Sequence, residues 1–296
     1  MSKVYSLHSQ GYGFLSTSTF TTLQGRYYNQ LSCGDCLYTS VQDLLNAQLQ
    51  LLYTANSIDP AAGFAEPIRP VLDGSLLTTS LTTTFPSTLK PILFTTVKDD
   101  ALVGTYLFFP QPVPAQAFTQ KLTISMGADR AAALANTTFY PFSESDTDVR
   151  GVFATIGTDT FWKCPAFTLA REWAKRGGTA YVGQFTLGAT YPGNGNFAGC
   201  TSGGVCHQDD IFILFGTTPN PSAAQSSLTD EVQARWSAFM RGGTPNGSGN
   251  TTWNPVSSSG SVDALNLGGT SAIPEGACTP SFWGSSVRFD YQIFNQ

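Results

Sequence analysis

A short apolar run, Lys90–Val97 (KPILFTTV), constrains the fold of this chain more than any other segment. Because it is rich in apolar and β-branched residues, it is typical of a strand buried within a parallel sheet. The segment Thr179–Leu187 (TAYVGQFTL) predicts a further strand. Helical patterns separate the two, and strands separated by helices indicate an α/β architecture.

Apolar residues at helical spacing, or helix-end signals, predict five helices. They are Val41–Ala55, Ala101–Phe109, Val149–Trp162, Pro165–Arg176 and Leu228–Arg241. In the fourth, Pro165 has a first-turn position and Gly177 follows the end, as helices prefer. We expect a loop at Tyr191–Cys206 and a long surface excursion at residues 242–275, because both are rich in Gly, Ser and Asn.

Composition excludes several classes of protein. Of the 296 residues, 41% are hydrophobic and 12% are charged, a balance that a disordered chain would reverse. The 15 Lys and Arg residues are scattered and the net charge is −5, so we expect no nucleic-acid partner, which would require clustered cations. Without a run of about 18 apolar residues, no transmembrane segment is expected. No cofactor or metal ion is predicted, because no motif with ligand spacing occurs.

Six cysteines permit three disulfides, which we expect to join Cys33 to Cys36, Cys200 to Cys206, and Cys164 to Cys278. The first pair could instead be a redox dithiol or half of a zinc site, but no thioredoxin-like pattern surrounds it. The second pair closes a small loop immediately before His207, and a bridge there would hold that loop rigid. The third pair follows by elimination.

Three glycosylation sequons begin at Asn136, Asn246 and Asn250. Together with the even number of cysteines and the low lysine content, they favour the secretory route and an extracellular protein. The first residues lack the apolar stretch of a signal peptide. These observations agree if an N-terminal portion of the protein lies outside this chain.

Three segments carry motifs that occur in a fixed order in one enzyme family. They are Pro91–Ala101 (PILFTTVKDDA), Cys206–Gly216 (CHQDDIFILFG), and Trp236–Asn246 (WSAFMRGGTPN) with Trp253 beyond it. Weaker matches lie in the same order at Cys33–Leu37, Pro67–Gly74 and Phe161–Pro165. Over about residues 30–255, the chain thus resembles the type-B carboxylesterases, the family of the cholinesterases and fungal lipases.

The resemblance implies two members of a Ser–acid–His catalytic triad, in the chain order of α/β-hydrolases. Asp100 takes the position of the acid, and His207 takes that of the base. An imidazole can accept the serine proton and return it to the leaving group, while a carboxylate holds it in the right tautomer. The sequence departs from the family pattern where Asp100 replaces Glu, and where Ala101 and Gln208 each replace Gly.

Other titratable residues are less favoured as catalytic residues. Asp99 is the neighbouring alternative for the acid. Asp209 and Asp210 fit the turn after the histidine better than they fit catalysis. His8, the only other histidine, has no motif around it.

The nucleophile is the missing member, because Gly-x-Ser-x-Gly occurs nowhere in the 296 residues. Tyr5–Gly11 (YSLHSQG) resembles the region that follows this motif in the family. The resemblance therefore implies that residues 1–296 form the C-terminal portion of a single α/β-hydrolase domain, with a mixed, mostly parallel sheet and flanking helices. An N-terminal partner chain carrying the serine would complete it, across an obligate apolar interface well above about 2,000 Å².

Two functions from different classes fit these features. As an enzyme, the chain is a subunit or fragment of a serine carboxylic-ester hydrolase that acts on a hydrophobic ester through an acyl-enzyme. Alternatively, the departures at Asp100, Ala101 and Gln208 indicate a decayed triad in a binding protein for an apolar small molecule or pigment. A structural or adhesive role has only those departures in its favour.

Overall fold

The computed structural model describes residues 85–247, 249–259 and 261–289, and the isolated positions 15–16, 18, 21–22, 71–72, 74–75 and 292. Among the isolated positions, β1 (Leu15–Ser16) pairs in parallel with β2 (Val71–Leu72). The predicted helix Val41–Ala55 and the cysteines Cys33 and Cys36 lie outside the described residues.

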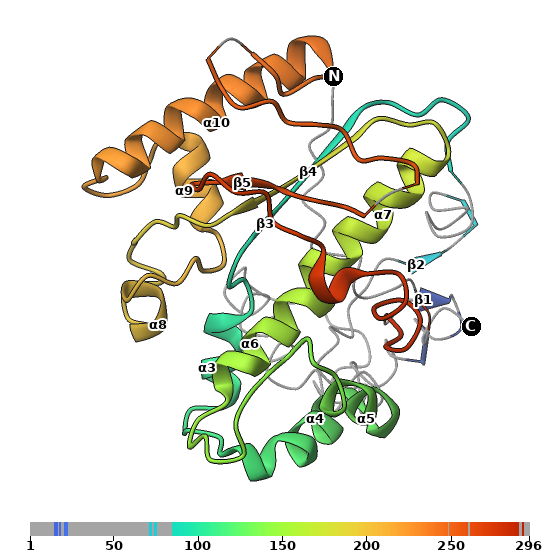
Figure 1. Cartoon of the computed structure of the whole chain (residues 1–296), viewed down its shortest axis with the longest axis vertical. Helices are drawn as coiled ribbons and strands as arrows, with labels where there is room; N and C mark the ends of the chain where they lie inside the picture. The colour runs from blue at the N-terminus through green and yellow to red at the C-terminus, as the bar shows by residue number, and fades with distance from the viewer. Residues whose placement is uncertain are drawn as a thin grey trace, which may run out of the picture.

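A parallel sheet of three strands joins distant parts of the chain (Figure 1). Its strands are β3 (Ile92–Val97), β4 (Ala180–Phe185) and β5 (Leu265–Leu267), in the order β3-β4-β5. The two strands expected from the sequence are β3 and β4, and Ile92 lies opposite Ala180 in their register. Parallel neighbours need a long crossover, and the helices between residues 102 and 175 provide it.

Both faces of this sheet are buried, as a parallel sheet requires. Side chains alternate along β3, so Ile92 and Phe94 enter one core while Leu93 and Val97 enter the other. The covering helices are α7 (Cys164–Lys175) on the first face, and α9 (Asp209–Phe215) and α10 (Ala223–Gly242) on the second. The expected α/β arrangement, with a parallel sheet and flanking helices, is therefore confirmed.

A single helical run replaces two helices that the sequence separated. α6 (Arg150–Thr158) continues through a π-helical turn (Asp159–Lys163) into α7, so both expected helices are present but no break separates them. Pro165 supplies the reason, because it lacks an N–H and its ring would clash with the carbonyl four residues earlier in a regular helix. A widened turn relieves this clash, and the Cys164 N–H accordingly donates to the Asp159 carbonyl.

Capping chemistry sets the ends of the two long covering helices. Gly177, with φ 82°, follows α7 in the left-handed conformation that glycine favours. α10 begins at Ala223 rather than at Leu228, because Ser222 and Gln225 form a reciprocal capping box. The buried stripes are those expected from the sequence, Ala166, Leu169, Ala170 and Trp173 in α7, and Leu228, Val232, Trp236 and Phe239 in α10.

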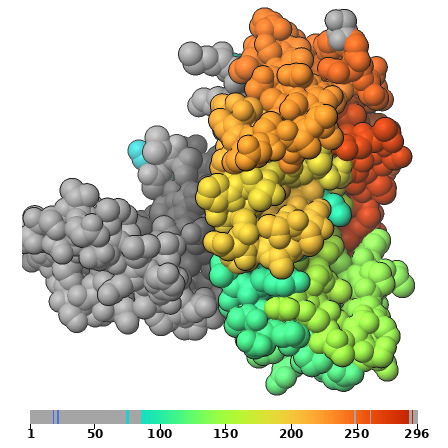
Figure 2. All heavy atoms as spheres, turned by 90° about the vertical axis from the view of Figure 1, so that its left-hand side faces the viewer, coloured from blue at the N-terminus to red at the C-terminus, as the bar shows by residue number. Residues whose placement is uncertain are grey.

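The remaining helices lie mostly beyond one end of the sheet, in the lower part of Figure 1. They are α3 (Leu102–Phe108), α4 (Phe118–Met126), α5 (Ala128–Ala135) and α8 (Ala198–Thr201), with 3-10 turns at Ala115–Ala117 and Gly276–Cys278. In Figure 2, the chain around residue 200 lies between this lower layer and the α9–α10 pair. None of the helices that the structure describes combines the length and apolar character needed to cross a bilayer.

The segment 242–275 is mostly exposed, as expected from its Gly, Ser and Asn content, but it is more than a surface excursion. It contributes β5 to the sheet and inserts Trp253 into the core, where the indole N–H donates to the Val182 carbonyl at 2.9 Å. The buried guanidinium of Arg235 donates to the Thr251 carbonyl and so directs the path of the segment. The sequence did not indicate this part in the core, because composition reports average polarity, whereas a few isolated apolar side chains decide burial.

Candidate active site

Asp100 and His207 lie in direct contact beside the carboxyl end of β3. Asp100 follows β3, and His207 lies in the loop between α8 and α9. Their Oδ1 and Nδ1 atoms are 2.6 Å apart. The side chain of Asp100 is 7% exposed and that of His207 is 35% exposed, so the carboxylate is shielded while the ring can be reached from solvent. A neutral ring in this arrangement donates its Nδ1–H to the carboxylate.

The neighbouring Asp99 has a different role, because it ties the end of β3 to the histidine loop. Its backbone N–H donates to the Val205 carbonyl at 2.9 Å, and its carboxylate accepts the Val205 N–H at 3.0 Å. Of the two adjacent acids, Asp100 is therefore the one in contact with the imidazole, and Asp99 brings the loop to it.

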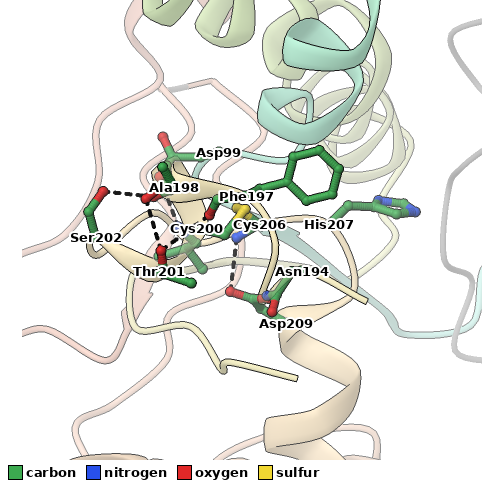
Figure 3. The surroundings of a disulfide bond; sticks show 12 residues. Asp99, Asn194, Phe197, Ala198, Cys200, Thr201, Ser202, Cys206, His207 and Asp209 are labelled. Carbon is green, nitrogen blue, oxygen red and sulfur yellow. Dashed lines mark hydrogen bonds between the residues drawn. A yellow bond between two sulfur atoms is a disulfide. The ribbon is translucent and has the colours of Figure 1, made fainter. Parts of the chain in front are cut away.

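A disulfide and a buried carboxylate hold the loop that carries His207 (Figure 3). Cys200 is bonded to Cys206, immediately before the histidine. Asp209 accepts the Cys206 N–H at 2.9 Å and a side-chain N–H of Asn194 at 2.7 Å. Asp209 thus holds the loop from the first turn of α9, where Asp210 also lies, so neither belongs to the turn that the sequence indicated. In Figure 3 the imidazole points away from the disulfide and from these hydrogen bonds.

Two further residues influence the position of the His207 backbone. The Tyr191 hydroxyl donates to the His207 carbonyl at 2.6 Å, and its ring stacks on Phe212 with centroids 4.1 Å apart. Gln208 has φ 73°, in the left-handed region that glycine favours. This conformation costs a residue with a side chain roughly 1–2 kcal/mol. The departure from glycine at this position is therefore accommodated at the expense of backbone strain.

The charges around the imidazole favour its protonated form. The hydrogen bond to Asp100 raises the pKa of His207 and outweighs burial, which lowers it, and the charges of Asp100, Asp210 and Asp209 raise it further. Burial raises the pKa of Asp209 to about 7. Burial and the charge of Asp100 raise the pKa of Asp210 to about 6. Asp209 therefore carries only part of its charge at neutral pH.

An apolar cavity of about 510 Å³ adjoins the pair. Asp100 and His207 contribute to its lining, together with apolar side chains from α3, α4 and α6 that include Phe108, Leu122 and Phe153. No lysine or arginine lines it in the part of the chain that the structure describes. A second cavity of about 580 Å³ extends along β3 toward α9 and α10 and also reaches His207. An apolar chamber beside a reactive pair suits an uncharged, apolar ligand.

Trp162 is a residue of the site that the sequence does not single out. Its ring centroid lies 5.7 Å from that of His207, and it lines both cavities. Sequence reasoning likewise misses Tyr191 and Asn194. For Trp162, the only signal is its place in the weak match at Phe161–Pro165, whereas the other two stand in a Gly-rich loop without any motif.

A second disulfide joins Cys164 at the start of α7 to Cys278, the pairing expected by elimination. These two cysteines and Asp159 are the only group of potential metal ligands among the described residues. Because the disulfide consumes both sulfur atoms, this group offers no thiolate to a metal ion.

The three sequon asparagines differ in their surroundings. Asn136 follows α5 and is exposed, and Asn250 is half-buried. The amide of Asn246 is engaged with the backbone of Trp253: its Nδ2 donates to the Trp253 carbonyl at 2.9 Å, and its Oδ1 accepts the Trp253 N–H at 2.7 Å. Asn246 therefore has a structural role, whereas Asn136 is the accessible sequon.

Comparison with known proteins identifies one family. A sequence model described as "Carboxylesterase family" matches residues 26–276, which is most of the chain and includes both Asp100 and His207. A search of curated proteins found no match. The parallel sheet with its flanking helices fits the α/β-hydrolase fold.

Proposed function

Because this chain belongs to the carboxylesterase family, we propose that it supplies the acid and the base of a serine carboxylic-ester hydrolase, Asp100 and His207. The observation that carries the proposal is the 2.6 Å contact between the Asp100 carboxylate and His207 Nδ1 beside an apolar cavity. A reachable imidazole held by a shielded carboxylate is what the base of an acyl transfer needs.

Each residue takes one part in the proposed reaction. Asp100 accepts the Nδ1–H of His207, which places the basic lone pair on Nε2. Nε2 takes the hydroxyl proton of the serine as its oxygen attacks the ester carbonyl, and it returns that proton to the departing alkoxide. The acyl-enzyme is then hydrolysed by water in the same two steps. Asp100 stabilises the imidazolium that forms each time.

The cavity supports an uncharged, hydrophobic ester as the substrate. Its lining is mostly apolar, and its polar groups beyond the pair are Thr105, Ser125, Tyr191 and Gln208. Apolar area removed from water contributes roughly 25 cal/mol per Å², so an aliphatic or aromatic ester gains affinity by entering it. The same cavity would serve a binding protein, and turnover is what separates the two functions.

We further propose that the serine comes from polypeptide outside these 296 residues, since Gly-x-Ser-x-Gly is absent from the sequence. In the order β3-β4-β5, the outer side of β3 has no strand beside it among the residues that the structure describes. Ile211, Phe215 and Met240 are exposed apolar side chains around the cavity along β3. A strand added there would extend the sheet and cover them, as in an obligate interface.

Secretion is also part of the proposal. The two disulfides, Cys164–Cys278 and Cys200–Cys206, are of a kind that persists in oxidising compartments and is rare in the cytosol. Peptide mapping of native protein from the culture medium, without reduction, should recover both bridges. Recovery of the protein only inside cells, with free thiols, would contradict this part.

A fluorophosphonate probe tests the hydrolase proposal on the native assembly. The probe bonds to an activated serine, so labelling is expected, and the labelled peptide identifies the polypeptide that carries the nucleophile. Turnover of a p-nitrophenyl ester should fall by roughly two to four orders of magnitude in His207→Ala. His8→Ala, a change at the only other histidine, is the matched control and should retain turnover.

The possible outcomes separate the parts of the proposal. An absence of labelling and turnover, with retained binding of the ester, assigns the chain to the binding function. A labelled serine within the 296 residues keeps the hydrolase but overturns the external nucleophile. Expressed alone, residues 1–296 should aggregate or melt without cooperativity in circular dichroism. A monodisperse, cooperatively melting monomer would overturn the partner.

A further inference from the structure

The π-helical turn at Asp159–Lys163 anchors a chain of buried hydrogen bonds that the proposed reaction does not use. The indole N–H of Trp283 donates to the Tyr140 hydroxyl at 2.7 Å. The Tyr140 hydroxyl donates in turn to Asp159 Oδ2 at 2.8 Å. All three side chains are buried. The bonds therefore connect the loop before α6, the π turn and the C-terminal segment.

The same turn presents Trp162 to the candidate active site. Asp159 lies at the start of the turn and is buried, while Trp162 lies three positions later and packs 5.7 Å from the His207 ring, centroid to centroid. A π turn accommodates one more residue than an α-helical turn, and such turns are rare and occur mostly as single turns inside α-helices, frequently at functional sites. A shift of one residue toward α-helical spacing would rotate Trp162 by about 100° about the helix axis. The contact with His207 therefore depends on the register of this turn.

We propose that Tyr140, Asp159 and Trp283 are positioning residues that hold the π turn in register, so that Trp162 packs against the imidazole of His207. The inference rests on the proposed function, because it concerns the base of that reaction. The three residues act on the imidazole through Trp162.

Burial fixes which group donates in these hydrogen bonds and makes the loss of a partner costly. Burial and the charge of Asp159 raise the pKa of Tyr140, so its hydroxyl keeps its proton and donates it to the carboxyl group. Burial also raises the pKa of Asp159, against the charge of Lys163 and the hydrogen bond from Tyr140. Removing one partner from such a chain of hydrogen bonds leaves a buried polar group unsatisfied, which destabilises the present register of the turn.

The segment that carries Trp283 is itself tied to α7 close to the π turn. The disulfide between Cys164 and Cys278 starts in the first residue of α7. The buried Arg171 pairs with Glu275 at 2.6 Å. These links bring the indole of Trp283 to a defined place against the turn, so the donor end of the hydrogen-bonded chain is rigid.

The imidazole of His207 can be followed directly by NMR, because the chain holds only two histidines and His8→Gln assigns the other signal. Tyr140→Phe and Trp283→Phe each remove one donor and keep an aromatic ring. In both, the Hε1 resonance of His207 should move because the ring current of Trp162 changes. Its pKa should rise because the imidazole gains hydration. Tyr181→Phe, which removes the hydroxyl of another buried tyrosine, is the matched control and should change neither.

Asp159→Asn keeps an oxygen acceptor for Tyr140 and should retain the parental resonance. If Tyr140→Phe does not fold, Trp283→Phe carries the comparison. A lower Tm with an unchanged His207 resonance would show that the hydrogen bonds are only structural, and the inference would be abandoned. Because the readout needs no ester turnover, its failure leaves the hydrolase proposal standing. An assembly without turnover would instead remove the catalytic meaning of the contact between Trp162 and His207, while the NMR result would still report whether the hydrogen bonds hold that contact.

Discussion

The Asp100 carboxylate lies 2.6 Å from Nδ1 of His207, although 107 positions separate the two residues in the chain. Beside this contact, the paired hydrogen bonds between Asp99 and Val205 bind the end of β3 to the histidine loop. The loop is thereby drawn close to the strand. An aspartate consequently reaches the histidine at a position where the resembled family has the longer glutamate.

The first prediction concerns the titration of His207. Asp100→Asn should lower the pKa of His207, because the carboxylate hydrogen bond is the largest cause of its elevation. Since the folded pKa is raised above the ordinary value of 6.5, the stability that this pair contributes is fully present below about pH 6.5. It is lost as the pH rises through the folded pKa. Urea unfolding of parent and variant between pH 5 and pH 9 should show a gap that narrows with pH, and a constant gap would contradict this.

The second prediction concerns Gln208, whose φ of 73° strains the backbone next to the histidine. Gln208→Gly removes a strain of roughly 1–2 kcal/mol but adds roughly 0.4–1 kcal/mol of unfolded-state entropy. The free energy of unfolding should therefore rise by roughly 0.5–1 kcal/mol in a denaturant titration. Asn220→Gly, at φ 48°, is the control and should change less, because asparagine tolerates this region. An equal gain at both positions would refute the argument.

The third prediction compares the two disulfides. The Cys164–Cys278 bridge spans a sequence separation of 114 and the Cys200–Cys206 bridge one of 6. In the chain-entropy account, their removal by paired alanine substitutions should cost about 5 and about 2 kcal/mol. Removal of the Cys200–Cys206 bridge should nevertheless have the larger effect on the His207 NMR signal, because this bridge holds the loop that carries His207. Urea unfolding and NMR of both double variants measure this, and the reverse order in either readout would count against it.

The fourth prediction concerns the sequons. Glycan should occur at Asn136, which is exposed, and not at Asn246, whose amide is bound to the Trp253 backbone by two hydrogen bonds. Asn246→Ala should lower the free energy of unfolding by about 1–3 kcal/mol, because it leaves buried backbone groups unsatisfied. Asn250→Ala is the control and should be near neutral. Glycopeptide mass spectrometry and thermal unfolding test the two parts, and full glycan occupancy at Asn246 would contradict the structural role.

The strands β3 and β4 and the buried stripes of α7 and α10 could be predicted, because periodicity along a short segment reports which side chains are buried. Gly177 marked a helix end for an equally local reason, its freedom to adopt positive φ. The residues of the candidate pair were named from short motifs with a defined chain order. For the strands and helices, the information lies within about ten consecutive residues, whereas the candidate pair also needed the order of its motifs along the chain.

The features that the sequence left open depend on partners far away in the chain. β5 is three residues long, and it is a strand only because β4 offers it an edge. The π turn arises where Pro165 meets a helix that could have ended there, and Tyr140 and Trp283 bond to it from distant segments. Such hydrogen bonds produce no periodic pattern in the sequence, because their donor and acceptor residues have no fixed separation along the chain.

For this protein, the sequence by itself determined the α/β class and the two principal strands, because these follow from local patterns of apolar residues. It indicated the base and a pair of adjacent candidate acids through motifs that resemble those of a known family. The tertiary structure decided which of two adjacent acids meets His207, and that Trp162 lies against the imidazole. Those choices depend on how β3, the histidine loop and the π turn pack together. Packing is set by contacts between segments roughly 50 to 100 residues apart, which local patterns do not encode.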